Sequence, residues 1–185
     1  MYLNTLIDSN TSGDNESSLK ERLRQVVGVD LTKIEGISTT TAITLISEIA
    51  LDMNKFPSEK HFASWLGLCP SNKISGGKVL SNKTQTKPNR AAEALRISAR
   101  SLHSSKSATG AFFRRIKARR GAPKAITATA HKLARLIYYM LKNGEEYVSI
   151  QMKEYEKKYK EQVLQNLQRK ASTLGFDLIP HVQAA

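Results

Sequence analysis

The sequence has 185 residues, a formal net charge of +13 and a pI near 9.9. Its length suits one domain with a buried core, and a single cysteine, Cys69, excludes a disulfide and a zinc site built from cysteines. No apolar run approaches the roughly 20 residues of a membrane-spanning helix and no signal-peptide pattern is present, so we expect a cytoplasmic, nucleoid-associated protein with no membrane partner.

The excess positive charge lies in one central stretch. Residues 73–135 contain 16 Lys or Arg and one acid, Glu93, whereas the rest of the chain has 13 basic and 15 acidic residues. This segregation predicts a polyanionic partner, with nucleic acid favoured over a membrane surface. The alternative is a solvated basic surface without a partner. The four histidines are scattered without metal-ligand spacing, so no metal site is expected in this chain.

Residues 1–16 are polar and turn-rich, which predicts a flexible lead-in. A first helix is expected from about residue 17, because Ser18 and Glu21 have the spacing of a capping box. Residues 19–50 are predicted to contain a helix-hairpin-helix motif, in which Gly36 makes the tight turn and Ser38 replaces the usual second glycine. In such a motif the start of the second helix, here with Ser38 and Thr39, points N–H groups at a DNA phosphate. An ordinary structural helix corner is the alternative.

A short helix over residues 59–66, with Trp65 packed inward, precedes a glycine-rich loop over residues 70–90. Ser75 lies in that loop, directly before Gly76 and Gly77 and between Lys73 and Lys78. Glycines allow the backbone to approach a bulky anion closely, and a hydroxyl among cations can contact a phosphate or attack it. The alternative is a flexible polar loop, since no general base is evident nearby.

Residues 90–142 are predicted to form basic helices. Residues 110–120 read GAFFRRIKARR, with Phe112 and Ile116 on one face and cations around the rest, as in a helix that contacts phosphates. A more apolar helix is expected over residues 124–142. The candidate nucleic-acid contacts of these helices are Arg90, Arg96, Arg114, Arg115, Lys117, Arg119, Arg120 and Lys124.

The last part of the chain, residues 145–185, is predicted to be a long amphipathic helix followed by a short tail. Apolar residues recur at spacings of three and four over about three to four heptads, which indicates coiled-coil character and a homo-oligomer or another partner chain. The fold class is therefore mainly α. A compact helical domain over residues 17–144 contains the hairpin motif and the serine loop, and the long helix follows it.

The ensemble of these motifs resembles one domain of a known transposase family. The hairpin, WLGLCP, the Ser-Gly pair, ALR and GAFFRR…GAPKAITATAHKLARLIY are similar to the C-terminal domain of DEDD-type insertion-sequence transposases of the IS-one-ten and IS-eleven-eleven groups. The similarity extends from about residue 17 to residue 178. Many members carry a Gly-rich segment after the serine, where this sequence has Lys87-Pro88-Asn89-Arg90.

The resemblance implies a function in DNA transposition. In the family, an N-terminal DEDD domain binds divalent metal, a C-terminal serine attacks the DNA backbone, and some members use a guide RNA. The family's serine falls on Ser75. This sequence lacks the four carboxylates, so the resemblance places the magnesium in a missing DEDD domain on another polypeptide.

A second reading is a catalytically inactive, truncated transposase remnant that only binds nucleic acid, and the missing carboxylates favour it. A third is an RNA-binding structural protein of ribosomal type, which accounts for the charge but not for the hairpin beside a Ser-Gly loop.

Overall fold

A computed structural model describes residues 14–49, 52–81, 84 and 88–179 of the chain. Its internal contacts divide the chain into two units, Met1–Val148 and Ser149–Ala185, and each is described by itself. The predicted lead-in lies almost wholly in residues 1–13, outside the described part. No helix within the described ranges is long and apolar enough to cross a membrane.

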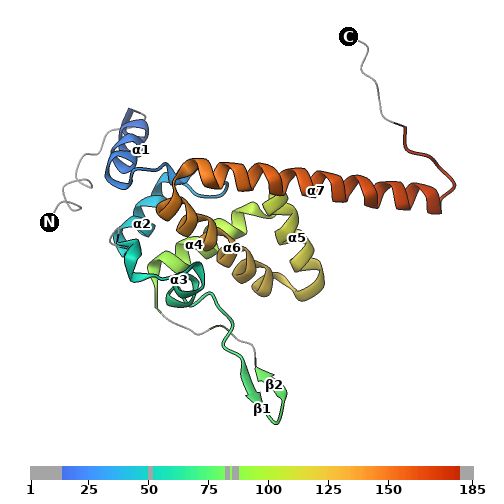
Figure 1. Ribbon diagram of the computed structural model, residues 1–185, viewed down its shortest axis with the longest axis horizontal. Coiled ribbons are helices and arrows are strands. Elements are labelled where there is room, and N and C mark those ends of the chain that lie inside the picture. Colours follow the sequence, from blue (N-terminus) through green and yellow to red (C-terminus); the bar gives the residue numbers. More distant parts are fainter. Residues whose placement is uncertain (1–13, 50–51, 82–83, 85–87, 180–185) are drawn as a thin grey trace. The chain divides into compact units, whose positions relative to one another are not determined.

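The first unit is mainly α-helical, which confirms the predicted fold class (Figure 1). Its helices and strands follow one another as α1 (Asp14–Val27), α2 (Thr39–Ile49), α3 (Glu59–Trp65), β1 (Lys73–Ser75), β2 (Lys78–Ser81), α4 (Arg90–Ser101), α5 (Ala108–Arg120) and α6 (Ala122–Asn143). Short 3₁₀ helices, η2 (Leu31–Lys33), η3 (Met53–Lys55) and η4 (Leu102–Ser104), connect some of them.

Helix α6 is the centre of this unit and packs against α3, α4 and α5. Apolar residues at helical spacing, including Leu133 and Ile137, are fully buried on its inner face. An aromatic group extends this core, since the Phe62 ring lies 5.0 Å from Phe56 and 6.1 Å from Tyr138 between centroids. The Tyr138 hydroxyl donates to the Phe56 carbonyl oxygen at 3.1 Å, so the buried polar group has a partner.

Strands β1 and β2 form an antiparallel hairpin that projects from the helices of the first unit (Figure 1). Ser75 pairs with Lys78 and Ile74 with Val79, and a bulge lies between Lys73 and Ile74. An isolated bridge between Pro70 and Thr84 closes the foot of the hairpin, beside Leu68, which is buried.

Helix α7 (Glu145–Thr173) begins at the end of the first unit and makes up most of the second. Within the second unit Tyr155, Tyr159 and Val163 are half-buried at a spacing of four, whereas Leu164 and Leu167 are exposed. The predicted long helix is therefore present, and its apolar residues are partly exposed. Two members of its expected stripe, Val148 and Met152, have side chains outside the described part.

The structure corrects two local predictions and does not confirm a third. Helix α1 already begins at Asp14, so Ser18 lies inside the helix and is not its cap. The helix-hairpin-helix motif is not confirmed, because the segment before Gly36 is the single 3₁₀ turn η2 and not an α-helix. Helix α6 begins at Ala122, two residues earlier than expected, because Pro123 occupies the first turn, where its missing N–H costs nothing.

Candidate nucleic-acid interface and serine hairpin

Ser75 is the last residue of β1 and lies at the tip of the hairpin. Gly76 and Gly77 have φ angles of 55° and 75°, the left-handed values that a type I′ turn requires at both central positions. This turn joins two strands directly, so Ser75 and Lys78 face each other as a register pair. Both are exposed. The two glycines after the serine thus form a two-residue turn between the strands.

Apolar side chains flank the serine on the hairpin. Ile74 is 63% exposed and Leu80 is 70% exposed, although both occupy strands. Lys73 contributes its backbone to the register, and its side chain lies outside the described part. A two-stranded ribbon of this kind has the dimensions that a DNA groove admits.

Gly36 lies against the protein interior. Its φ is +86°, and a Cβ added there would meet Leu102 Cγ at 3.0 Å. At the start of α2, the Ser38 hydroxyl accepts from the Thr41 N–H at 3.2 Å, and the Thr41 hydroxyl lies 3.3 Å from that of Ser98 on α4. Ser38 therefore caps α2 and Thr39 is buried, so the geometry supports a structural role for this corner and does not test a phosphate contact.

Two cations of α5 hold the preceding loop. Arg114 Nη1 donates to the carbonyl oxygens of His103, at 3.0 Å, and Ser105. Lys117 Nζ lies 3.2 Å from Nε2 of His103. The Ser105 hydroxyl in turn donates to Glu35, which ties this loop to the turn before α2. Arg114 and Lys117 were predicted as phosphate contacts only, and the loop partners were not foreseen.

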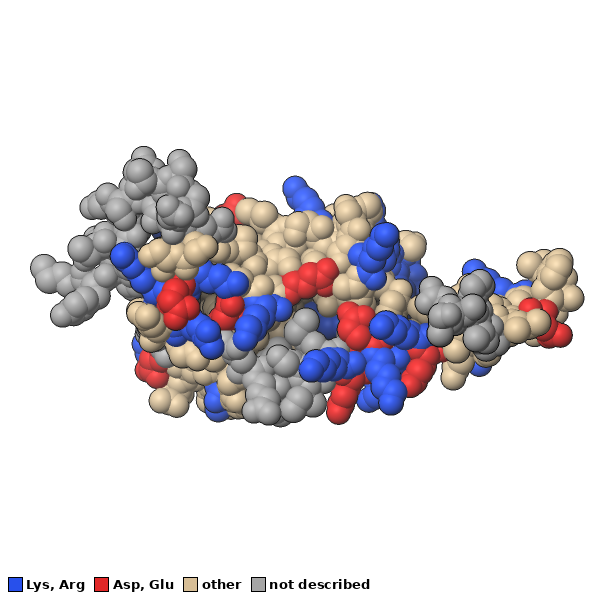
Figure 2. Space-filling model, turned by 90° about the horizontal axis from the view of Figure 1, so that it is seen from above, with Lys and Arg blue, Asp and Glu red and all other residues tan. Residues whose placement is uncertain are grey.

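The other predicted cations of the helical part lie on three helices, α4, α5 and α6. Arg115, Arg119 and Arg120 are exposed on α5, as is Lys124 on α6. On α4, Arg90 is exposed and Arg96 is half-buried. The face presented in Figure 2 shows Lys and Arg interspersed with Asp and Glu.

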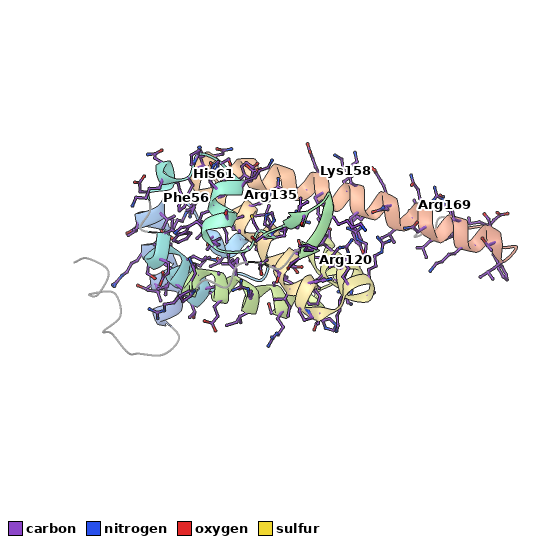
Figure 3. All side chains as sticks on the ribbon, turned by 90° about the horizontal axis from the view of Figure 1, so that it is seen from below. Phe56, His61, Arg120, Arg135, Lys158 and Arg169 are labelled. Carbon is purple, nitrogen blue, oxygen red and sulfur yellow. The ribbon has the colours of Figure 1, made fainter. Side chains whose placement is uncertain are left out.

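A pocket of about 720 Å³ lies between the foot of the hairpin, α5 and α6. Figure 3 labels Arg120, which lines it from the end of α5. This pocket could not be predicted from the sequence, because its lining residues come from segments as far apart in the chain as Leu68 and His131. Its lining residues are Leu68, Pro70, Thr84, Phe112, Ile116, Arg120, Pro123, Lys124, Thr127, Ala128 and His131.

His131 is half-buried in this pocket. Burial lowers the pKa of its imidazole below the ordinary value of 6.5, the positive charge of Arg135 lowers it further, and Glu59 opposes both. Glu59 is itself paired with Arg135, at 3.7 Å between Oε1 and Nη2. His131 is therefore neutral at neutral pH and has both a donor and an acceptor nitrogen.

Among the described residues no group of three His, Cys, Asp or Glu side chains could hold a metal ion. The side chains present therefore do not fit the divalent metal that the resemblance implies for a DEDD domain. No chemical step in this chain is routed through it.

The fold and hairpin define a mainly α-helical domain that presents a serine between glycines and lysines. Residues 30–113 match the family model described as Transposase IS116/IS110/IS902 family. This confirms the resemblance over just under half of the chain, from η2 to α5 and including Ser75. The match supports the predicted C-terminal transposase domain in that segment and a role in transposition, and the family suggests interaction with DNA. No curated protein matches the chain.

Proposed function

We propose that this chain binds DNA and presents Ser75 as the nucleophile that attacks the scissile phosphate during transposition. The observation that carries the proposal is the placement of Ser75, exposed at the tip of a type I′ hairpin and paired with Lys78. A short two-residue turn fixes the direction of the serine, which a flexible loop would not do. Fixed geometry is what a reacting group needs to be effective.

In the proposed step the Ser75 Oγ forms a bond to phosphorus and the scissile P–O bond breaks. The hydroxyl proton passes to a base, and the leaving oxygen of the DNA takes up a proton. Lys78 is the register partner of the serine, and in the proposal its ammonium stabilises negative charge on the phosphate.

In this proposal the chain binds DNA through contacts to its phosphates. Arg115, Arg119 and Arg120 are exposed on α5, and Lys124 follows at the start of α6, close to the foot of the hairpin through the shared pocket. Arg90 and Arg96 extend the set along α4. Contacts of this type set affinity and register but carry no sequence information.

The metal and the general base belong, in this proposal, to a DEDD domain outside this sequence. That domain would supply the carboxylates and the magnesium, and a guide RNA or a second copy of this chain would complete the assembly. Localisation with the nucleoid follows from DNA binding.

The test uses Ser75→Ala, with Ser81→Ala as the matched control on the same hairpin. A DEDD domain is supplied in trans, and strand cleavage and DNA affinity are measured separately. We expect Ser75→Ala to abolish cleavage and to leave affinity unchanged, while Ser81→Ala cleaves normally. Cleavage by Ser75→Ala at the wild-type rate would falsify the nucleophile role.

The second candidate is a remnant that binds DNA without chemistry. The lack of a metal-binding cluster among the described side chains favours it. It predicts salt-sensitive DNA binding together with no cleavage by the wild-type chain, even with a DEDD domain present. The same pair of measurements therefore separates the two functions.

A further inference from the structure

The pocket described above lies directly at the foot of the serine hairpin. Pro70 and Thr84, which form the bridge that closes the hairpin, are also part of the pocket wall. Ser75 lies five positions after Pro70 in the sequence, a span of at most about 18 Å in extended chain. At about 3.4 Å per nucleotide step in a duplex, this is a distance of about five steps or fewer along one strand.

The lining of the pocket combines apolar side chains with cations. Its apolar wall is made by Leu68, Phe112 and Ile116, whereas Arg120 and Lys124 bring two cations to it. None of the described residues that line it carries a carboxylate. The pocket therefore has an apolar wall next to two cations, and no described lining residue is an acid. This lining matches a ligand with a flat apolar ring attached to a phosphate.

Polar groups suited to the edge of such a ring are also present. Thr84, Thr127 and His131 line the pocket. The Thr127 hydroxyl donates to the Pro123 carbonyl oxygen at 3.1 Å and keeps its acceptor lone pairs. His131, neutral at neutral pH, offers one donor and one acceptor nitrogen. Donors and acceptors together recognise the hydrogen-bonding edge of a nucleobase.

We infer that this pocket binds one unpaired nucleobase of the DNA strand, with the attached phosphate held by Arg120 and Lys124. The inference rests on the proposed function and adds to it a site for a base that has left the duplex. The captured base lies within a few nucleotides of the phosphate that Ser75 attacks. Unpaired or mismatched bases cost least to extrude, so the pocket favours DNA that is already distorted there.

A different occupant would be an apolar segment of a partner protein. The two cations in the pocket and the absence of lining carboxylates disfavour it, because a protein segment would need matching acids. The experiment below includes this occupant as an outcome that overturns the inference.

The test compares duplexes of about 20 base pairs, roughly two helical turns, that carry one extra unpaired nucleotide with or without its base. The variant Thr127→Trp places a large side chain in the pocket. Thr44→Trp is the matched control, because Thr44 is also half-buried, lies on another helix, α2, and makes the same bond to its own helix, at 3.0 Å to the Thr40 carbonyl oxygen. A second pocket variant, Ala128→Trp, keeps the test valid if Thr127→Trp fails to fold.

For the wild type and Thr44→Trp, we expect the duplex with the unpaired base to bind about tenfold more tightly than the abasic duplex. For both pocket variants we expect this ratio to fall to about one, with affinity for a fully paired duplex retained. Equal binding of the two duplexes by the wild type would overturn the inference, as would an unchanged ratio in the pocket variants. If the wild type shows no salt-dependent binding to any duplex, the proposed function itself is refuted.

Discussion

The substitution Gly36→Ala tests the role of the turn before α2. Gly36 has a φ of +86°, a conformation that strains any residue with a Cβ. The new Cβ would also lie 3.0 to 3.2 Å from three carbon atoms of Leu102, whose side chain is buried at 2% exposure. Two separate costs therefore act on one substitution.

The magnitude follows from these two costs. Left-handed strain in a residue other than glycine costs about 1–2 kcal/mol, and overpacking of a buried side chain costs about 1–3 kcal/mol. We therefore expect Gly36→Ala to lower the free energy of unfolding by about 2–5 kcal/mol, a large part of the stability of an ordinary domain. Gly28→Ala is the matched control, since its φ is +79° and nothing lies within 4 Å of the added Cβ.

The assay is urea unfolding of the wild type, both single variants and a double-mutant cycle with Leu102→Ala. The control Gly28→Ala should lose only the strain contribution. In the Leu102→Ala background the added methyl group finds space, so the cost of Gly36→Ala should shrink by about 1 kcal/mol or more. Equal losses in Gly36→Ala and Gly28→Ala, or no coupling to Leu102, would refute the packing argument.

Two further predictions concern charge. Replacing Arg119 and Arg120 by Ala should reduce the slope of log DNA affinity against log salt concentration by about 2 between about 50 and 200 mM. Replacing the exposed pair Arg22 and Arg24 should leave the slope unchanged. If the Arg119/Arg120 variant has the same slope as the wild type, a phosphate contact by α5 is contradicted. The pKa of His131 is lower in the folded state than its ordinary 6.5, so the unfolded chain binds more protons and the free energy of unfolding should decrease as pH falls below about 6.5. His131→Gln should flatten this dependence in urea titrations at pH about 7.5 and about 5.5, and an unchanged pH profile would exclude His131 as its source.

Much of the fold could be predicted because local signals mark its boundaries. Asn89 accepts from the Ala92 N–H at 2.9 Å and caps α4 where a helix was expected to start, and Gly121 and Gly144 end α5 and α6. The pair Gly76-Gly77 is equally local, yet its meaning was left open. Two consecutive glycines suit both a flexible loop and a type I′ turn, and only the strand pairing on each side decides between them.

The remaining features depend on contacts between distant segments. The pocket joins Leu68, Phe112 and His131, whose spacing in the sequence carries no common pattern. Helix periodicity placed Phe112 and Ile116 on one face, but it is Phe113 that is buried, at 3% exposure, while Phe112 lines the open pocket. Likewise, the sequence shows that Arg114 is basic but not that the loop carbonyls of His103 and Ser105 receive its guanidinium.

The position of the serine follows from the foot of the hairpin more than from its tip. A two-stranded hairpin alone is marginally stable in water, and here Ile74 and Leu80 are exposed and add little burial. What fixes the hairpin is the Pro70–Thr84 bridge beside the buried Leu68, at the same place where α5 and α6 bring Arg120 and Lys124. In the proposed function, DNA bound at the foot stabilises the segment that carries Ser75, although Ser75 itself does not contribute to that binding. This separation is the physical reason that loss of the serine hydroxyl should remove cleavage and leave binding intact.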